Sequence, residues 1–187
     1  MDTEILNMLE EFVTPDKVEL IDQVLSERTK HLRVVLEHIY YSQNASAVMR
    51  TCDCFGIQDL YITQNLNDYE VNPNVVRGSS KWVTQYMYDR EEDSSKKCFA
   101  DLRKKNYRIV GITPSPNAAS ILELDINQPT AIIFGTEKEG LSEYAKVGVD
   151  QIGKNTDVWF YGVFNISVSA ALVLREVVSR LKKSDLE

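Results

Sequence analysis

Short apolar segments of the length of buried strands alternate along this chain with segments of helical spacing. The first strand-like segment, 32–39, is followed by a helical one at 45–55, and the alternation recurs further along. Strands that alternate with helices form parallel sheets with helices on both faces. We therefore expect an α/β fold. The other expected strands are 59–63, 82–87, 107–113 and 130–134, and the other expected helices are 94–106 and 165–181.

Two short helices are expected before the first strand, because apolar residues recur there at helical spacing on either side of Pro15. The 187 residues, 43% of them hydrophobic, suffice for one domain with a sizeable core plus a small appendage. We expect residues 1–30 to form a helical N-terminal extension and residues 31–187 to form the main domain.

Composition bears on location and on metal binding. No apolar run reaches the roughly 18 residues that span a bilayer, and the acidic N-terminus has no basic residue before Lys17. Cys52, Cys54 and Cys98 cannot all pair within one chain, and no second Cys/His cluster stands at zinc-ligand spacing from them. We expect a cytoplasmic protein with reduced thiols, no membrane partner and no metal.

The net charge of −7 is unusual for a nucleic-acid-binding protein, because phosphate contacts need Lys and Arg. The basic residues nevertheless gather in two clusters, which are candidates for substrate binding. An ordinary solvated surface is the alternative interpretation. The clusters are Arg28, Lys30, His31 and Arg33 at the start of the first strand, and Arg77 with Lys81 around Gly78.

The first of three polar segments, Gln43 to Arg50, opens the expected helix at 45–55, with Asn44 as a candidate N-cap. Arg50 then projects from near the carboxyl end of the first strand, where open α/β sheets bind ligands. Taken alone, the segment also fits a capped helix with a solvated arginine. Helical spacing turns Ala45, Val48, Met49 and Cys52 toward the core and places Ser46, Arg50 and Asp53 on the other face.

The second polar segment, Phe134 to Ser142, follows the buried strand 130–134. Gly135 and Gly140 allow tight turns and a close approach of backbone to ligand, and Glu137 can accept hydrogen bonds from an arginine or a ribose hydroxyl. The segment contains neither a GxGxxG nor a Walker sequence. Taken alone, it also fits an ordinary glycine-bounded turn.

The third polar segment, Phe164 to Ala171, opens the last expected helix. Asn165 stands at its start, the small residues Ala170 and Ala171 permit close packing, and the free N–H groups of the first turn can meet a ligand. A well-capped core helix is the alternative interpretation of this segment alone.

In this order and at this spacing, the three segments resemble the signature motifs of the SpoU (TrmH-type) RNA 2'-O-methyltransferases. Further matches lie at Val34 to Glu37, at Gly56 and at Gly78 to Val83, and the similarity covers residues 18–180. The helical extension is similar to that of the tRNA (guanosine-18) branch. The resemblance implies methyl transfer from S-adenosylmethionine to a tRNA ribose 2'-hydroxyl, at guanosine 18 of the D-loop. Methylation of rRNA or of another tRNA position, and a non-catalytic RNA-binding protein on the same fold, are the alternatives.

The resemblance also implies a deep C-terminal trefoil knot and a homodimer whose active sites take residues from both subunits. By motif match it makes Arg50 a catalytic residue, with Asn44, Glu137 and Asn165 in support. Because arginine stays protonated, Arg50 is better suited to bind a phosphate or stabilise the developing alkoxide than to act as the base. The residues that match the family's cofactor pocket are Thr113, Pro114, Gly135, Gly140, Asn155, Val163 and Phe164.

Residues 155–164 depart from the family pattern. The family has a segment like Ile-Pro-Met-x-Gly-x-x-x-Ser-Leu here, whereas this chain has Val163 in place of the serine and lacks the proline. A one-nucleotide slip in a possible coding of these residues gives Ile-Pro-Met-Tyr-Gly-Phe-Thr-Glu-Ser-Phe. We hypothesise that the segment was read out of frame. An intact mass that matches the printed sequence rejects a recording error. Relatives often continue with more helix beyond the position of Lys183, so a truncated end is one interpretation of this terminus.

Overall fold

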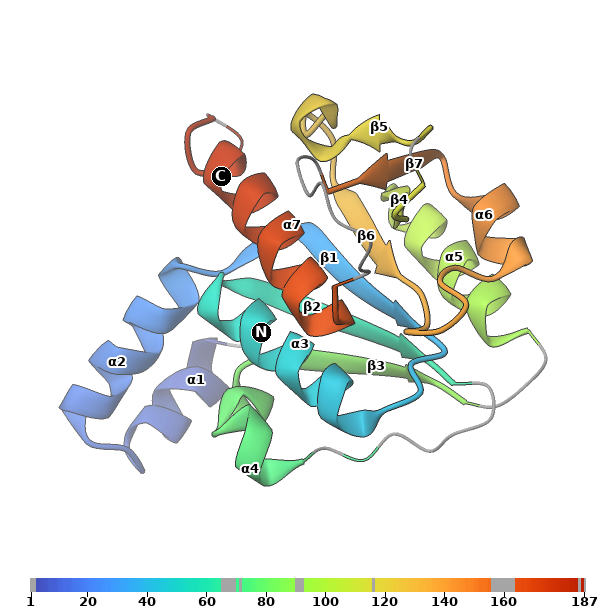
Figure 1. Cartoon of the computed structure of the whole chain (residues 1–187). Coiled ribbons are helices and arrows are strands. Elements are labelled where there is room, and N and C mark those ends of the chain that lie inside the picture. The colour runs from blue at the N-terminus through green and yellow to red at the C-terminus, as the bar shows by residue number, and fades with distance from the viewer. Residues whose placement is uncertain are drawn as a thin grey trace.

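The computed structural model describes residues 3–64, 70, 72–89, 93–115, 117–155, 164–184 and 186. Within these residues, seven strands form one parallel sheet in the order β3-β2-β1-β6-β4-β7-β5 (Figure 1). The strands are β1 (Thr29–Glu37), β2 (Ile57–Thr63), β3 (Thr84–Tyr88), β4 (Arg108–Ile112), β5 (Ala119–Ser120), β6 (Thr130–Phe134) and β7 (Gln151–Lys154).

Helices cover both faces of the sheet. On one face α3 (Ser42–Cys54) packs against α7 (Ile166–Leu181), and on the other lie α5 (Ser94–Lys104) and α6 (Glu143–Gly148) (Figure 1). Each layer has its own apolar core, which includes Met49 and Leu174 under α3 and α7, and Phe99 under α5. The predicted α/β class, with a parallel sheet between two helical layers, is confirmed.

The start of α3 differs from the prediction. The helix begins at Ser42 with Tyr41 as its N-cap, so the expectation that Asn44 caps it was wrong. Asn44 lies in the first turn, where its side chain bonds to other segments of the chain. Ser46 was expected on the outer face but is buried, because α4 (Pro73–Val76) packs against α3 and the backbone N–H of Asn72 donates to Ser46 Oγ over 3.0 Å.

The other predicted boundaries lie within three residues of the observed ones, and strand 130–134 coincides with β6. Asn165 is the N-cap of α7 and accepts a hydrogen bond from the backbone of Ser167. The sequence did not predict the short elements, which are too brief to show a hydrophobic period. These are α4, β5, α6, β7 and the 3₁₀ turns η1 (Ser79–Lys81) and η2 (Ile121–Glu123).

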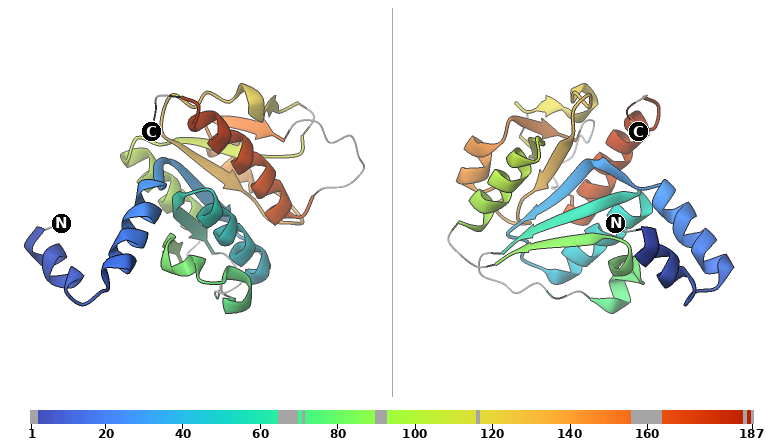
Figure 2. Two further views of the ribbon diagram at one scale, coloured as in Figure 1. Left: turned by 90° about the vertical axis from the view of Figure 1, so that its left-hand side faces the viewer. Right: turned by 180° about the vertical axis from the view of Figure 1, so that it is seen from behind.

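Two helices, α1 (Thr3–Glu10) and α2 (Pro15–Ser26), precede the sheet as expected and project from its layers (Figure 2). Neither contains a buried residue. The chain enters β1 beside Gly56, where a side chain would collide with the carbonyl oxygen of Glu27, so glycine is required. Among the described segments, no helix is long and apolar enough to cross a membrane.

Candidate active site

The carboxyl ends of the central strands β1 and β6 lie side by side, and the chain leaves them toward opposite faces of the sheet. From β1 it passes into α3, whereas from β6 it passes through residues 135–142 into α6 on the other face (Figure 1). Open parallel sheets bind ligands outside such a switch point, because the diverging loops leave a crevice there. The fold therefore places a candidate site at this edge.

Three of the predicted catalytic residues meet at this switch point through side-chain hydrogen bonds. Asn44 Nδ2 donates to Glu137 Oε1 over 2.6 Å, and Asn165 Nδ2 donates to Asn44 Oδ1 over 3.2 Å. The backbone N–H of Tyr40 donates to the second oxygen of Glu137 over 3.2 Å. The three polar segments, far apart in sequence, are thus joined in one network at the start of α3, after β6 and at the start of α7.

The loop after β6 folds back on itself. Thr136 and Gly140 exchange backbone hydrogen bonds of 2.8 and 3.0 Å, and a side chain at Gly135 would collide with the backbone of Gly140 and Leu141. Gly140 has a φ of +71°, and a Cβ there would meet nothing within 4 Å. Gly135 is therefore required for the fold of the loop, and Gly140 leaves open space beside the backbone that a ligand can approach.

The described residues that match a cofactor pocket lie after three neighbouring strands, β6, β4 and β7. Thr113 follows β4, is half-buried, and donates its backbone N–H to Gly153 of β7 over 2.9 Å. Pro114 is exposed beside it, Asn155 follows β7, and the exposed Phe164 precedes Asn165. Val163 and most of the segment that departs from the family pattern lie outside the described residues.

Arg50 is exposed on α3 and has no hydrogen bond or ion pair with any residue that the structure describes. It lies six residues beyond Asn44, which corresponds to about 9 Å of helix rise. The structure does not join Arg50 to the network of Asn44, Glu137 and Asn165 within one chain. The guanidinium is exposed to solvent.

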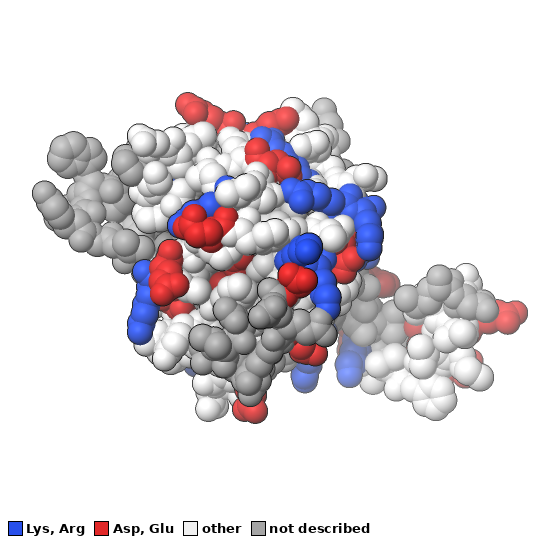
Figure 3. All heavy atoms as spheres, turned by 90° about the vertical axis from the view of Figure 1, so that its right-hand side faces the viewer, with Lys and Arg blue, Asp and Glu red and all other residues white. Residues whose placement is uncertain are grey.

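The five predicted substrate-binding residues fall into two groups. Arg28 and Arg33 are held inside the protein by the carboxylates of Asp53 and Asp59, whereas Lys30, Arg77 and Lys81 are exposed. Arg28 precedes β1, Lys30 stands near its start and Arg33 is its middle residue, so none of the three lies at the carboxyl ends of the strands. On the face that includes α5 and α6, basic side chains are intermixed with acidic ones (Figure 3). The ion pairs of these helices include Arg103 with Asp150 and three pairs between residues three positions apart.

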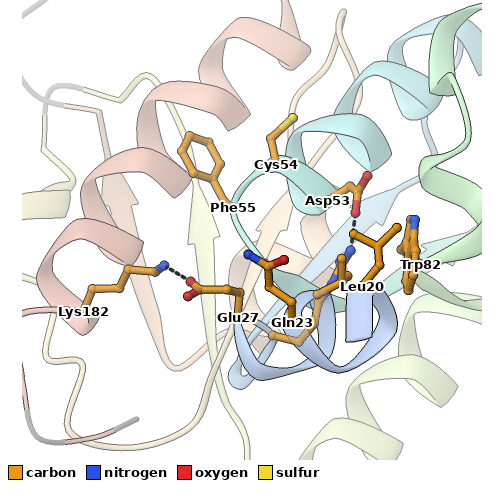
Figure 4. Close-up of a pocket in the computed structure, with 11 residues that line it drawn as sticks. Leu20, Gln23, Glu27, Asp53, Cys54, Phe55, Trp82 and Lys182 are labelled. Carbon is orange, nitrogen blue, oxygen red and sulfur yellow. Dashed lines mark hydrogen bonds and ion pairs between the residues drawn. The ribbon is translucent and has the colours of Figure 1, made fainter. Parts of the chain in front are cut away.

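A groove of about 490 Å³ lies at the opposite, amino-terminal edge of the sheet, between α2 and the end of α3 (Figure 4). Lys182 Nζ donates to Glu27 over 2.9 Å at one side of it, and Arg28 binds Asp53 at the other. The polar motif residues lie at the other edge, at the carboxyl ends of the strands. We therefore do not assign this groove to the candidate active site.

Cys54 lines this groove and is exposed, whereas Cys52 and Cys98 are buried, and burial raises the pKa of both buried thiols. The thiolate is the reactive form, so we expect one of the three cysteines to react with Ellman's reagent in the folded protein. The other two should react only after unfolding in guanidinium. Rapid titration of two or three thiols without denaturant would contradict this burial.

One buried carboxylate at the switch point was missed as a site residue. Glu37 ends β1, is 1% exposed, and accepts hydrogen bonds from Ser95 and Ser142. The sequence feature that could have identified Glu37 is a charged residue at the end of an apolar strand. Its hydrogen-bond partners lie in distant segments, and the sequence does not show that these segments are close in space. Within the described parts of the chain, no group of three or more His, Cys, Asp or Glu side chains is arranged to hold a metal ion.

A parallel sheet with polar side chains gathered where its central strands diverge defines a ligand-binding protein of the open α/β class. The chain belongs more particularly to the SpoU rRNA Methylase family, whose model matches residues 31–175. The resemblance seen in the three polar segments is thereby confirmed.

Individual relatives agree with this assignment. A tRNA (guanosine(18)-2'-O)-methyltransferase of Borreliella burgdorferi is 35% identical over 190 aligned positions, which cover 100% of this chain and 85% of the relative. The crystal structure of the A. aeolicus TrmH/SpoU tRNA modifying enzyme superposes with a TM-score of 0.80 at 24% identity, over 90% of this chain and 84% of that one.

A more distant structural match contains a cofactor. The SpoU methyltransferase AviRb from Streptomyces viridochromogenes, in complex with AdoMet, has a TM-score of 0.69 at 18% identity, over 86% of this chain and 64% of that one. At this identity the match supports the shared fold alone.

Proposed function

We propose that this protein is a tRNA ribose 2'-O-methyltransferase that uses S-adenosylmethionine and modifies guanosine 18 of the D-loop. The full-length similarity to a curated enzyme of that activity carries the proposal, together with the network that joins Asn44, Glu137 and Asn165 at the switch point. Methyl transfer needs the oxygen, methyl carbon and sulfur in line, so positioning should dominate catalysis.

The cofactor is proposed to bind outside β6, β4 and β7, whose following loops lie next to one another. The open space at Gly140 and the neighbouring position of Thr113 fit a ligand held largely by backbone groups. Pro114, Gly135, Asn155, Val163 and Phe164 complete the proposed set. When bound, S-adenosylmethionine supplies an electrophilic methyl group.

Each of the four predicted catalytic residues has a distinct proposed role. Arg50 stabilises negative charge on the ribose oxygen or binds the adjacent phosphate, because its guanidinium is exposed and permanently protonated. Glu137 holds the amide of Asn44, and Asn44 in turn accepts from Asn165, which fixes the start of α7 against α3. These contacts keep the groups in a fixed arrangement before the substrate arrives.

For the RNA surface we retain three of the five basic residues. Arg77 and Lys81 are exposed beside α3, the helix that carries Arg50, and Lys30 is exposed at the start of β1. Arg28 and Arg33 are engaged by buried or half-buried carboxylates, so contact with a phosphate would require them to leave those partners.

Several properties implied by the family are part of the same proposal. We infer a C-terminal trefoil knot, a homodimer in which Arg50 of one subunit completes the site of the other, and a cytoplasmic location. The absence of an Arg50 partner among the described residues of its own chain agrees with the dimer. Residues 1–30 are proposed to be a helical extension of the methyltransferase domain at 31–187. Sedimentation equilibrium tests the dimer.

The function is tested by incubating the protein with unmodified tRNA transcripts and S-adenosylmethionine, and then mapping the methylated ribose. Methylation of guanosine 18 is the expected result, and a transcript with 2'-deoxyguanosine at that position should accept no methyl group. Methylation elsewhere, or of rRNA alone, would support the alternative substrates. Failure to bind S-adenosylmethionine in calorimetry would instead favour the non-catalytic RNA-binding alternative. The observation behind this alternative is that residues 155–164 depart from the family pattern.

A further inference from the structure

Glu37 is a buried carboxylate at the carboxyl end of β1 whose hydrogen bonds link three separate segments. Its Oε1 accepts from Ser95 Oγ at the start of α5 and from Ser142 Oγ before α6, both over 2.8 Å. Its Oε2 accepts from the backbone N–H of Ser142 over 3.0 Å. Only 1% of Glu37 is exposed, and it forms no ion pair with any described residue. The donors to this carboxylate among the described residues are two hydroxyls and one backbone N–H, all of them neutral.

Ser142 is the residue at which the loop after β6 ends. Its hydroxyl accepts from the backbone N–H of Ala145 over 3.0 Å and so caps α6. The preceding residue, Leu141, is buried at 3% exposure. One end of the loop 135–142 is therefore fixed by its continuity with β6, and the other is fixed by Glu37.

The same loop carries Glu137, which binds Asn44 and the backbone of Tyr40. A displacement of Ser142 would move the turn at Thr136 to Gly140 and with it the carboxylate that holds Asn44. Displacements of about 1 Å at a remote position can lower a reaction rate by about 10²-fold when catalysis depends on positioning. Among the described residues Glu37 makes no hydrogen bond to Asn44 or Asn165, and the loop 135–142 links its partner Ser142 to Glu137, which binds Asn44.

We propose that Glu37 is a positioning residue that sets the loop 135–142 for cofactor binding and methyl transfer. The inference about catalysis rests on the proposed function, whereas the inference about the loop does not. Packing alone does not account for a carboxylate here, because burying a charge is costly unless its hydrogen bonds are satisfied. An apolar side chain at position 37 could accept none of the three hydrogen bonds that Ser95 and Ser142 donate.

Two substitutions separate the length of this side chain from its charge. Glu37→Gln keeps the length, and its carbonyl oxygen can accept from the Ser142 N–H while its amide donates to the two hydroxyls, which also act as acceptors. Glu37→Asp keeps the charge but is one methylene shorter, so it cannot reach both serines. We expect Glu37→Gln to behave nearly as the unchanged protein and Glu37→Asp to behave as Glu37→Ala.

The measurements are amide hydrogen exchange over residues 136–142 without ligand, calorimetric binding of S-adenosylmethionine, and steady-state methylation of tRNA. Glu37→Asp should lose exchange protection in the loop and bind S-adenosylmethionine roughly 10–100-fold more weakly, with the KM for tRNA nearly unchanged. Circular dichroism verifies that each variant is folded. Glu37→Asp and Glu37→Gln decide the matter if Glu37→Ala does not fold.

Unchanged loop protection and cofactor affinity in folded Glu37→Asp would overturn the proposal. A loss in Glu37→Gln that is absent from Glu37→Asp would also overturn it, because the charge and not the reach of the side chain would then be decisive. If the unchanged protein binds no S-adenosylmethionine, the proposed function fails, but the exchange data still decide whether Glu37 holds the loop.

Discussion

Replacing Arg50 with alanine should lower kcat/KM for tRNA methylation roughly 10²–10³-fold, the loss expected when a group that stabilises developing charge is removed. The same change should leave thermal stability nearly unaltered. Arg50 is exposed and has no partner among the described residues, so its truncation breaks no internal contact that the structure records. The rate is followed with labelled S-adenosylmethionine and a tRNA transcript, and the unfolding temperature by calorimetry.

Loss of a positive charge anywhere on the protein could weaken tRNA binding, and a matched control separates this effect. Lys104→Ala removes an exposed charge from α5, on the face of the sheet opposite to α3, where Lys104 pairs with Asp101 over 3.5 Å. This control should keep kcat close to that of the unchanged protein. Retention of more than about a tenth of kcat/KM by Arg50→Ala would contradict the proposed role.

The fold was largely predictable from the sequence because strand and helix patterns depend on local composition. β6 was predicted at its observed bounds, since Thr130 to Phe134 is a compact apolar run that ends at a glycine. The start of α3 was not, because Asn44 is a good N-cap residue by type. Its amide is instead used by Glu137 and Asn165, which are distant in sequence, so tertiary contacts override the local preference.

The site was predictable as a set of residues but not as an arrangement. Motif spacing selected Asn44, Glu137 and Asn165, yet only the sheet order shows that β1 and β6 are neighbours. Arg28 and Arg33 were read as a basic cluster because sequence gives charge without burial. The structure pairs each with a carboxylate that follows much later in the chain.

The ion pair of Arg33 and Asp59 is almost completely buried. The two residues are register partners on β1 and β2, and Arg33 Nη2 lies 2.9 Å from Asp59 Oδ2. Arg33 also donates to Tyr61 Oη over 2.8 Å and stacks on Tyr107, with 3.9 Å between the guanidinium carbon and the ring centroid. The side chains of Arg33 and Asp59 are only 9% and 3% exposed.

Asp59→Ala should therefore lower the free energy of unfolding by about 3–5 kcal/mol, because it leaves a buried guanidinium without its counter-charge. The double variant Arg33→Met, Asp59→Leu should recover most of that loss, since it removes both charges and fills the space with apolar atoms. Urea unfolding followed by circular dichroism measures both. For comparison, Glu143→Ala breaks the exposed pair with Lys146 and should leave the unfolding midpoint almost unchanged.

The outcome also decides what Arg33 does. If Asp59→Ala is as stable as the unchanged protein, Arg33 does not depend on Asp59 for its place in the fold. A role of Arg33 in RNA binding would then be considered again. If stability falls as expected and the double variant still methylates tRNA with an unchanged KM, Arg33 contributes to folding and not to substrate binding. Both results are informative because the pair lies on the strands and not at their carboxyl ends, so its removal leaves Asn44, Glu137 and Asn165 in place.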